Sequence, residues 1–323
     1  MEKITPADLL DIAATANLAP SVHNTQPTRW HFDPDGAIRL SADQTRRLKI
    51  GDPTGRDLEV SVGAALEGTM IALSNRGLVG ALEPGDSLRI VPRGGASPDP
   101  LAPEMSRRTT WRRGFAPAAI ALSQSLTQWA AQHDDIGLVH EPAAMAVISR
   151  VNERTSLAFY RNAPYRNELL SWMRLSRSDP RFGVDGLSAP AMGMSGFEAL
   201  GAGMVLRQPL FGVLDLIGVF GGLMSEERHT LGAMAVLLFH RPINEHPVQT
   251  GRSLYRRQLE LSALGLQTWP MSVLADDPEV AAELVKEHAI SADRRLVTAW
   301  RVGPLPAEAQ VRRERLPAAA LIG

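Results

Sequence analysis

The chain of 323 residues contains no cysteine. Without thiols it can hold neither a disulfide nor a thiolate-bound zinc ion, and it cannot use a cysteine nucleophile. Neither sign of charge is in excess, because 34 Lys and Arg side chains stand against 35 Asp and Glu side chains. This balance argues against a nucleic acid held on a broad basic face, and we expect no such partner.

Long apolar runs are also missing. The most apolar stretch, residues 199–224, is interrupted by Arg207, Gln208, Pro209 and Asp215, so it falls short of the roughly 18 uninterrupted residues that a membrane span needs. The first twenty residues mix acidic with apolar side chains and lack the apolar core of a secretory signal. We therefore expect a cytoplasmic protein with no membrane partner. A hydrophobic content of 44% with 21% charged residues is typical of a folded globular chain.

Hydrophobic periodicity predicts helices and strands along the whole chain. The first helix is capped by Thr5 and ends at Pro20, and residues 182–224, rich in Gly, Met and Pro, are predicted to be loose. The other predicted helices span residues 58–76, 123–131, 143–160 and 167–174, and the predicted strands lie in residues 29–40 (a hairpin around Gly36), 88–92, 136–140, 232–239 and 297–302.

Two long helices of the chain have similar sequences. Residues 63–78 align without gaps on residues 251–266, and each segment begins at a glycine and ends in Gly-Leu. A Pro/Gly/Ser-rich connector between Pro84 and Pro103 is the best internal boundary. Two amphipathic helices can resemble each other by chance, but together these features suggest two related halves, residues 1–105 and 106–323.

Four clusters of polar residues are candidates for binding. Residues 20–27 place five hydrogen-bonding side chains between two prolines, and residues 106–115 hold four arginines that repel one another unless an anion neutralises them. Residues 312–315 add three more arginines, and residues 268–272 could present backbone N–H groups to a heterocycle. The alternatives are a helix terminus for the first cluster, solvated charged surfaces for the two arginine clusters, and a simple turn for the last.

Several common catalytic signatures are missing. The sequence has no G-x-x-x-x-G-K-[ST] phosphate loop, and Gly201-Ala-Gly203 lacks the third glycine of a dinucleotide fingerprint. The eight histidines show no zinc-ligand spacing, so no metal is predicted. Ser195 lacks the glycine that would complete a G-x-S-x-G elbow, which makes serine hydrolysis a poor hypothesis.

Three of the polar clusters resemble motifs of a known family. Ala19-Pro-Ser-Val-His-Asn-Thr-Gln-Pro27 resembles the A-P-S-x-x-N-x-Q-P-W signature of the nitroreductase superfamily, although Thr28 stands in place of its Trp. Arg108-Thr-Thr-Trp-Arg112 resembles its R-x-[ST]-x-R motif, and Arg313-Glu-Arg315 resembles its C-terminal basic pair. Because the first motif precedes the second, the chain resembles the Acg-type FMN-binding oxidoreductases, in which two nitroreductase-like halves are fused into a pseudo-dimer.

The resemblance implies an α+β nitroreductase-like fold with antiparallel sheets flanked by long central helices. It also implies one FMN per chain, held between the halves, with hydride chemistry at flavin N5 and no catalytic side chain. Ser272-Val273 departs from the family, many members of which carry Glu-Gly there. The implied cofactor-binding residues are Pro20, Ser21, Asn24 and Gln26 from the first half, and Arg108, Thr110, Arg112, Pro270, Met271, Ser272, Arg313 and Arg315 from the second.

The function implied by the resemblance is an NAD(P)H-dependent FMN oxidoreductase. Its acceptor would be a nitroaromatic, a quinone or an activated alkene, and the chain would be a monomeric pseudo-dimer or a weak homodimer. One alternative is a non-catalytic protein that sequesters FMN beneath a lid formed by residues 182–224. Another is a degenerate relative that binds nothing.

Overall fold

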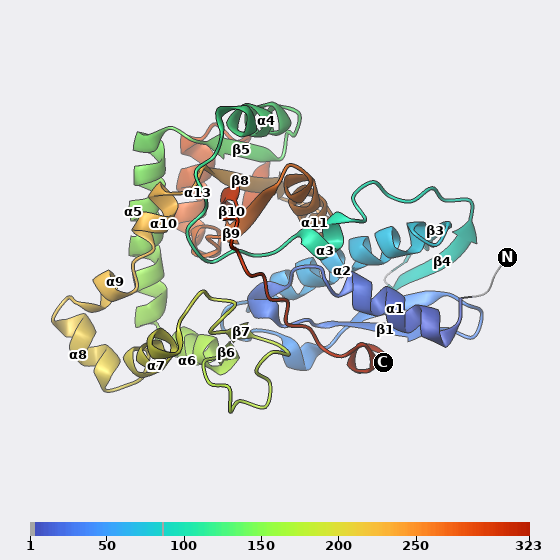
Figure 1. The fold of residues 1–323 in the computed structure, drawn as a ribbon, viewed down its shortest axis with the longest axis horizontal. Helices are drawn as coiled ribbons and strands as arrows, with labels where there is room; N and C mark the ends of the chain where they lie inside the picture. Colours follow the sequence, from blue (N-terminus) through green and yellow to red (C-terminus); the bar gives the residue numbers. More distant parts are fainter. Residues whose placement is uncertain (1–3, 86) are drawn as a thin grey trace.

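The computed structural model describes residues 4–85 and 87–323. Its α+β architecture places a four-stranded antiparallel sheet on either side of a pair of crossed central helices, as the sequence predicts (Figure 1). No helix in the ranges just given is both long and apolar enough to span a lipid bilayer.

The N-terminal half forms the first sheet and one central helix. Its first helix begins at a capping box in which Thr5 and Asp8 bond each other's backbone, as the sequence suggests. The predicted hairpin forms around Gly36, whose φ of 88° suits a tight turn. The elements of this half are α1 (Pro6–Ala16), η1 (Val22–Asn24), β1 (Thr28–Phe32), β2 (Ile38–Ala42), η2 (Gln44–Arg46), α2 (Arg56–Ser74), β3 (Leu78–Leu82), β4 (Leu88–Gly94) and α3 (Glu104–Arg107).

The C-terminal half forms the second sheet, the other central helix and a helical excursion, α7 to α9, that extends away from both sheets (Figure 1). Its elements are α4 (Ile120–Ala131), β5 (Ile136–Val139), α5 (Pro142–Arg161), α6 (Ala163–Trp172), β6 (Met173–Arg174), β7 (Leu187–Ser188), α7 (Gly196–Val205), α8 (Leu210–Leu216), α9 (Phe220–Leu223), α10 (Glu227–Leu231), β8 (Ala235–Pro242), α11 (Pro247–Ala263), β9 (Leu266–Pro270), α12 (Val273–Asp276), α13 (Pro278–Glu287), β10 (Arg294–Pro304) and η3 (Ala318–Leu321).

The two sheets share one topology. Their strand orders are β1-β2-β4-β3 and β5-β8-β10-β9, so in both the first strand in sequence is an edge and the fourth pairs with the second. In both halves the long helix, α2 or α11, connects the second strand to the third. These are the two helices whose sequences align.

The central helices cross at a pair of glycines. A Cβ atom on Gly63 would lie 2.0 Å from the carbonyl oxygen of Val248, and one on Gly251 would lie 2.0 Å from that of Val60. Both distances are far inside van der Waals contact, so the crossing requires glycine on each helix. Nearby, the carboxylate of Glu67 in α2 accepts hydrogen bonds from two arginines of α11, Arg252 at 2.9 Å and Arg256 at 2.7 Å.

The C-terminal tail, residues 305–323, leaves the second sheet and returns to the first half (Figure 1). Ile322 pairs with Trp30 of β1, and the Gly323 amide donates to the Trp30 carbonyl at 3.0 Å. Leu321 is buried in the same core as the Trp30 ring. The tail therefore joins the two halves, and its course carries residues 312–315 past the junction between them.

Some sequence expectations differ from the structure. The segment 182–224 contains the helices α7, α8 and α9, so it is less loose than predicted. Its first helix carries a complete capping box of Ser195 and Glu198, a signal present in the sequence. Helix α6 starts at Ala163, four residues before its predicted start, because the side chain of Asn162 caps it. Strands β3 and β9 were not predicted, since both are short and directly follow a long helix.

We expect Gly63→Ala to lower the free energy of unfolding by roughly 2–3 kcal/mol, because the added methyl group forces the two central helices apart. Gly201→Ala, also within a helix but with open space around the added methyl, should leave stability unchanged or raise it by about 1 kcal/mol. Urea denaturation of both variants measures the difference, and equal midpoints would contradict this account of the crossing.

Candidate functional site

The loop of residues 20–27, here called the binding loop, has an unusual backbone. His23, Asn24 and Gln26 have φ values of 46°, 55° and 51°, and they are three of the four non-glycine residues with positive φ in the described part of the chain. Each left-handed residue costs on the order of 1 kcal/mol. Such strain persists only where the surroundings impose it, and it concentrates at functional sites.

Two serine hydroxyls fix the shape of the binding loop. Ser21 Oγ accepts a hydrogen bond from the Gln26 amide at 2.9 Å, which closes the loop on itself. Ser61 Oγ, on α2, accepts one from the Val22 amide at 3.2 Å and ties the loop to the central helix. The loop is therefore positioned by the same helix crossing that joins the halves.

The arginine segment, residues 108–112, runs beside the edge strand β9 of the second sheet. Thr110 forms a parallel bridge with Thr268, and the Trp111 amide donates to the Thr268 carbonyl at 3.0 Å. The Thr109 amide donates to Gln267 Oε1 at 2.6 Å. These bonds fix the backbone on both sides of Arg108 and lead the segment toward the binding loop.

The C-terminal tail adds further guanidinium groups at the same place. Arg315 donates to the carbonyl oxygens of Asn17 at 2.6 Å and Leu18 at 3.0 Å, and to Asn24 Oδ1 at 3.0 Å. Arg313 donates to the Arg107 carbonyl at 2.8 Å. The tail thus connects the binding loop to the arginine segment.

Together these segments enclose a cavity that we call the arginine pocket. Asn24 and Arg112, from opposite halves of the chain, both line it. Five arginines and one glutamate contribute to its walls, so its lining carries an excess of positive charge. The sequence-predicted residues that line it are Pro20, Ser21, Asn24, Arg108, Thr110, Arg112, Arg313 and Arg315.

Burial lowers the pKa values of three arginines of this pocket. It lowers the pKa of Arg315 to about 9, with the nearby Arg108 charge contributing, and the pKa of Arg112 to about 10. Burial also lowers the pKa of Arg108. Guanidinium groups taken out of water and held near one another favour an anion between them.

Four polar atoms at this place are buried without a hydrogen-bond partner among the described residues: Arg108 Nε, His23 Nδ1, Thr25 Oγ1 and Glu314 Oε2. An unsatisfied buried polar group costs about 1–3 kcal/mol and is rare in folded proteins. The unpaired Arg108 Nε–H is a donor suited to an anion in the pocket.

A second, more apolar pocket adjoins the arginine pocket and shares Pro20 and Ser21 with it. Pro270 and Ser272 line this adjoining pocket from the end of β9, and Gln258 of α11 contributes to its wall. Together the two pockets offer arginines that can bind an anion at one end and apolar walls at the other.

Two sequence-predicted residues lie behind these pockets. Met271 is 2% exposed, packs in the core of the second half and donates its amide to the Ala299 carbonyl at 2.8 Å. Gln26 is also buried, and its Oε1 accepts from Asn17 at 2.8 Å and from the Leu316 amide at 2.7 Å. Both residues support the walls of the site instead of facing its interior.

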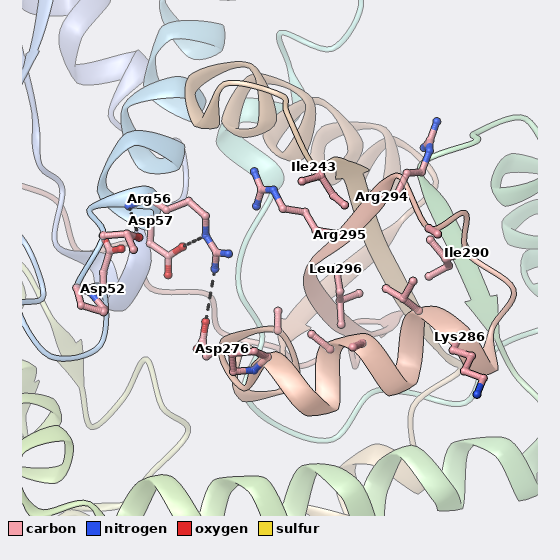
Figure 2. Close-up of a pocket in the computed structure, with 18 of the residues that line it drawn as sticks. Asp52, Arg56, Asp57, Ile243, Asp276, Lys286, Ile290, Arg294, Arg295 and Leu296 are labelled. Atoms are coloured by element: carbon pink, nitrogen blue, oxygen red, sulfur yellow. Dashed lines mark hydrogen bonds and ion pairs between the residues drawn. The ribbon is translucent and has the colours of Figure 1, made fainter.

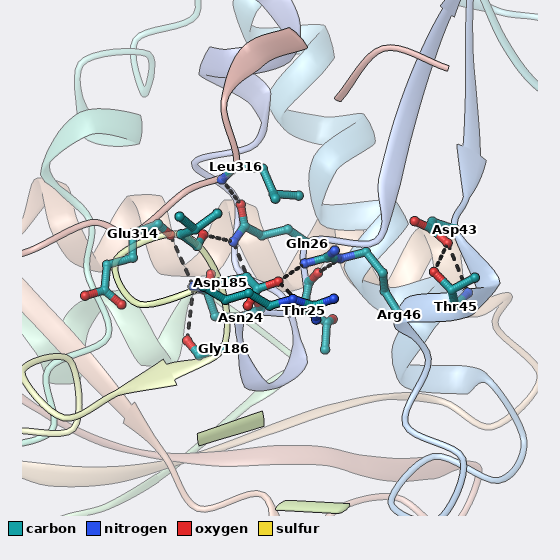
Figure 3. A network of polar contacts seen from close by, with 12 residues as sticks. Asn24, Thr25, Gln26, Asp43, Thr45, Arg46, Asp185, Gly186, Glu314 and Leu316 are labelled. Atoms are coloured by element: carbon teal, nitrogen blue, oxygen red, sulfur yellow. Dashed lines mark hydrogen bonds and ion pairs between the residues drawn. The ribbon is translucent and has the colours of Figure 1, made fainter. Parts of the chain in front are cut away.

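Residues 184–191, here called the strap, cover the arginine pocket, and Gly186, Leu187 and Ala191 line it. Figure 3 shows Asn24 and Gln26 between the strap and the C-terminal tail. Asn24 Nδ2 donates to the Gly186 carbonyl at 3.2 Å, and Gln26 Nε2 donates to that of Val184 at 2.9 Å.

A buried carboxylate anchors the start of the strap. Asp185 is 1% exposed and accepts hydrogen bonds from Arg174 at 2.9 and 3.1 Å. Arg46 donates to the same carboxylate and to the Thr25 carbonyl of the binding loop. Arg46 therefore links the strap to the first half (Figure 3).

Sequence reasoning did not single out several residues of the site. Arg312 and Glu314 belong to a noted cluster, and His23 lies inside a noted motif, but only tertiary contacts distinguish them from surface groups. The strap was expected only as part of a longer lid over residues 182–224. Among residues 4–85 and 87–323, no group of three or more His, Asp or Glu side chains is arranged to hold a metal ion.

Sequence comparison finds relatives for a short part of the chain. No family model matches it. Two Mycobacterium tuberculosis proteins, from strains CDC 1551 and H37Rv, are each 42% identical to it over 59 residues, and their provisional names describe them as NAD(P)H nitroreductases. Part of the chain is therefore nitroreductase-like. The match spans 18% of this chain and only 17% of the length of each relative.

Comparison with solved structures returns FMN proteins at low similarity. The FMN- and NADPH-dependent nitroreductase NfnB from a Sphingopyxis strain is 16% identical, with a TM-score of 0.35 over 67% of this chain and 93% of that one. A Bacteroides fragilis nitroreductase with bound FMN is 11% identical, with a TM-score of 0.36 over 68% and 95% of the two chains.

His23 predicts a pH dependence of stability. Burial, assisted by the Arg112 charge, lowers the pKa of His23 to about 4. The unfolded chain takes up this proton at about pH 6.5, so stability should decline as the pH falls from 6.5 and level off near 4, by about 1–3 kcal/mol in total. His23→Asn keeps a residue tolerant of positive φ and should remove this part of the decline in urea denaturation. An unchanged decline would show that His23 is not held neutral.

Proposed function

We propose that the chain is an FMN-dependent oxidoreductase of the nitroreductase type. The observation that carries the proposal is the arginine pocket, where the buried Arg108 and further guanidiniums from the arginine segment and the tail meet a strained loop from the other half. The names of the two M. tuberculosis relatives, NAD(P)H nitroreductases, support the same chemistry.

The residues present fit FMN. Arg108, Arg112, Arg313 and Arg315 would hold its phosphate, and the unpaired Arg108 Nε–H would find a partner there. The isoalloxazine would enter the adjoining pocket beside Pro270 and Ser272. FMN supplies hydride transfer at N5, so the protein needs to bind, orient and shield it, without a side-chain nucleophile.

The fused pseudo-dimer of residues 1–105 and 106–323 is part of this proposal. Its support is the strand order common to both sheets and the reciprocal glycines at the helix crossing. The arginine segment and the tail belong to the second half, and the binding loop belongs to the first. The chain contains one arginine segment, one tail and one binding loop, so we expect one FMN per chain.

The reaction we propose passes hydride from NAD(P)H to a nitroaromatic, a quinone or an activated alkene. The substrate and the nicotinamide partner follow from the names of the relatives and the motif resemblance.

One observation favours a second candidate function, FMN sequestration without turnover. The strap leaves a volume of only about 80 Å³ in the arginine pocket, below the roughly 300–1,000 Å³ of most ligand pockets. It is held by Asn24, Gln26 and the buried Asp185. A strap that closed again over bound FMN would keep nicotinamide away from it.

Absorbance spectroscopy tests both functions. Purified protein that binds FMN is yellow, and a colourless protein that stays so with added FMN would refute both. Anaerobic NADH or NADPH should bleach the flavin of an oxidoreductase, whereas a sequestering protein keeps its colour.

Arg108→Ala should weaken FMN binding by about 2–3 kcal/mol, because the phosphate loses a buried charge-assisted donor. Arg107→Ala is the matched control, since the neighbouring Arg107 side chain is 69% exposed and does not line the pocket. Fluorescence titration with FMN compares the two variants. Equal affinities would remove Arg108 from the phosphate site.

A further inference from the structure

A large cavity lies outside the arginine pocket. It has a volume of about 870 Å³, within the range of small-molecule sites. The loop before α2 and the start of that helix form one side, and α12, α13 and the start of β10 form the other (Figure 2). None of the twelve residues that the sequence nominated for FMN lines it.

This large cavity adjoins the proposed flavin site. Asp57 and Asp276 line both the large cavity and the adjoining pocket. The adjoining pocket shares Pro20 and Ser21 with the arginine pocket. The three cavities therefore form a series, and the two aspartates stand at the boundary between the largest and the proposed position of the isoalloxazine.

The large cavity is amphipathic. Its α13 side is mainly apolar, with Ala281, Ala282 and Val285 beside Lys286, and Ile243 and Leu296 extend the apolar wall. Its polar end holds the two aspartates with Arg56 between them (Figure 2). Arg56 Nε lies 3.3 Å from Asp57 Oδ1, and its NH2 group lies 4.0 Å from Asp276 Oδ1.

Burial and mutual repulsion favour the protonated form of these two carboxyls. Burial, together with the Asp57 charge, raises the pKa of Asp276 to about 8, and burial raises the pKa of Asp57. The groups that face the pair are Asp52 from the preceding loop, Arg56, Arg295 from β10 and Tyr165 from α6. The two arginines are too few to ionise both carboxyls, since Asp52 adds a third negative charge.

We propose that the large cavity binds the electron acceptor, an apolar molecule bearing a carbonyl oxygen, and that the Asp57–Asp276 pair donates a hydrogen bond and then a proton to that oxygen. This rests on the proposed function. A quinone that gains a hydride from the reduced flavin and a proton from the carboxyl becomes a hydroquinone, and the flavin is oxidised. The carboxylate left behind takes a proton from water through the open mouth of the cavity.

Binding of the naphthoquinone menadione, without nicotinamide, tests the proposal by equilibrium dialysis. Affinity of the wild-type protein should fall about tenfold between pH 7 and 9, the equivalent of one hydrogen bond, as the shared proton is lost. Asp276→Asn keeps an N–H donor at every pH, so its affinity should stay constant over that range. Glu279→Gln, the same loss of charge on an exposed part of α13, should behave like the wild type.

Ala282→Trp provides a second variant that does not depend on titration. Ala282 is exposed and lines the cavity, so the large side chain should occupy part of the space and weaken menadione binding while the chain folds normally. The proposal would be overturned if the wild-type protein did not bind menadione, or if its affinity did not change with pH. Undiminished binding to Ala282→Trp would also overturn it.

These experiments distinguish a failure of the acceptor-site proposal from a failure of the proposed function. FMN content is measured by absorbance on the same samples, and Ala282→Trp should retain FMN at the wild-type level. A protein that binds FMN and is bleached by NADPH, yet fails the menadione tests, keeps its proposed function and loses only the acceptor site.

Discussion

The close crossing of α2 and α11 is the contact on which the rest of the structure depends. Gly63 and Gly251 let the two backbones meet at a distance that any side chain would forbid. The crossing fixes one half of the chain against the other. Ser61, two residues from Gly63, holds the binding loop, and Gln258 of α11 reaches Arg108 at 3.4 Å. The binding loop and Arg108 form the two sides of the proposed site, and this one helix contact positions both of them.

The candidate site contains several features that destabilise the folded chain locally. It combines left-handed backbone at His23, Asn24 and Gln26 with closely spaced, mutually repelling arginines and unpaired polar atoms. The buried Glu67, by contrast, is compensated by Arg252 and Arg256. A ligand with a negative charge at one end and an apolar ring at the other would relieve both the charge and the unsatisfied donor.

The cavities arrange three kinds of chemistry in sequence. The arginine pocket offers charge, the adjoining pocket offers an apolar slot, and the large cavity adds a carboxyl pair beside an apolar wall. In an oxidoreductase these would serve phosphate, ring and acceptor. Residues of the strap line only the first of them.

The sequence by itself determined most of the local structure, because capping, periodicity and turn residues act over a few positions. The Thr5 capping box, the hairpin at Gly36 and the α2 helix follow from neighbours in the chain, and the arginine motif near Arg108 indicated an anion. Short strands such as β9 could not be predicted, since their stability comes from pairing with distant β10. The tertiary structure alone decided that Met271 and Gln26 turn away from the pockets, that His23 Nδ1 is buried near the Arg112 charge, and that Asp57 and Asp276 line the same two cavities. Those facts depend on contacts between residues far apart in the chain, which no local pattern encodes.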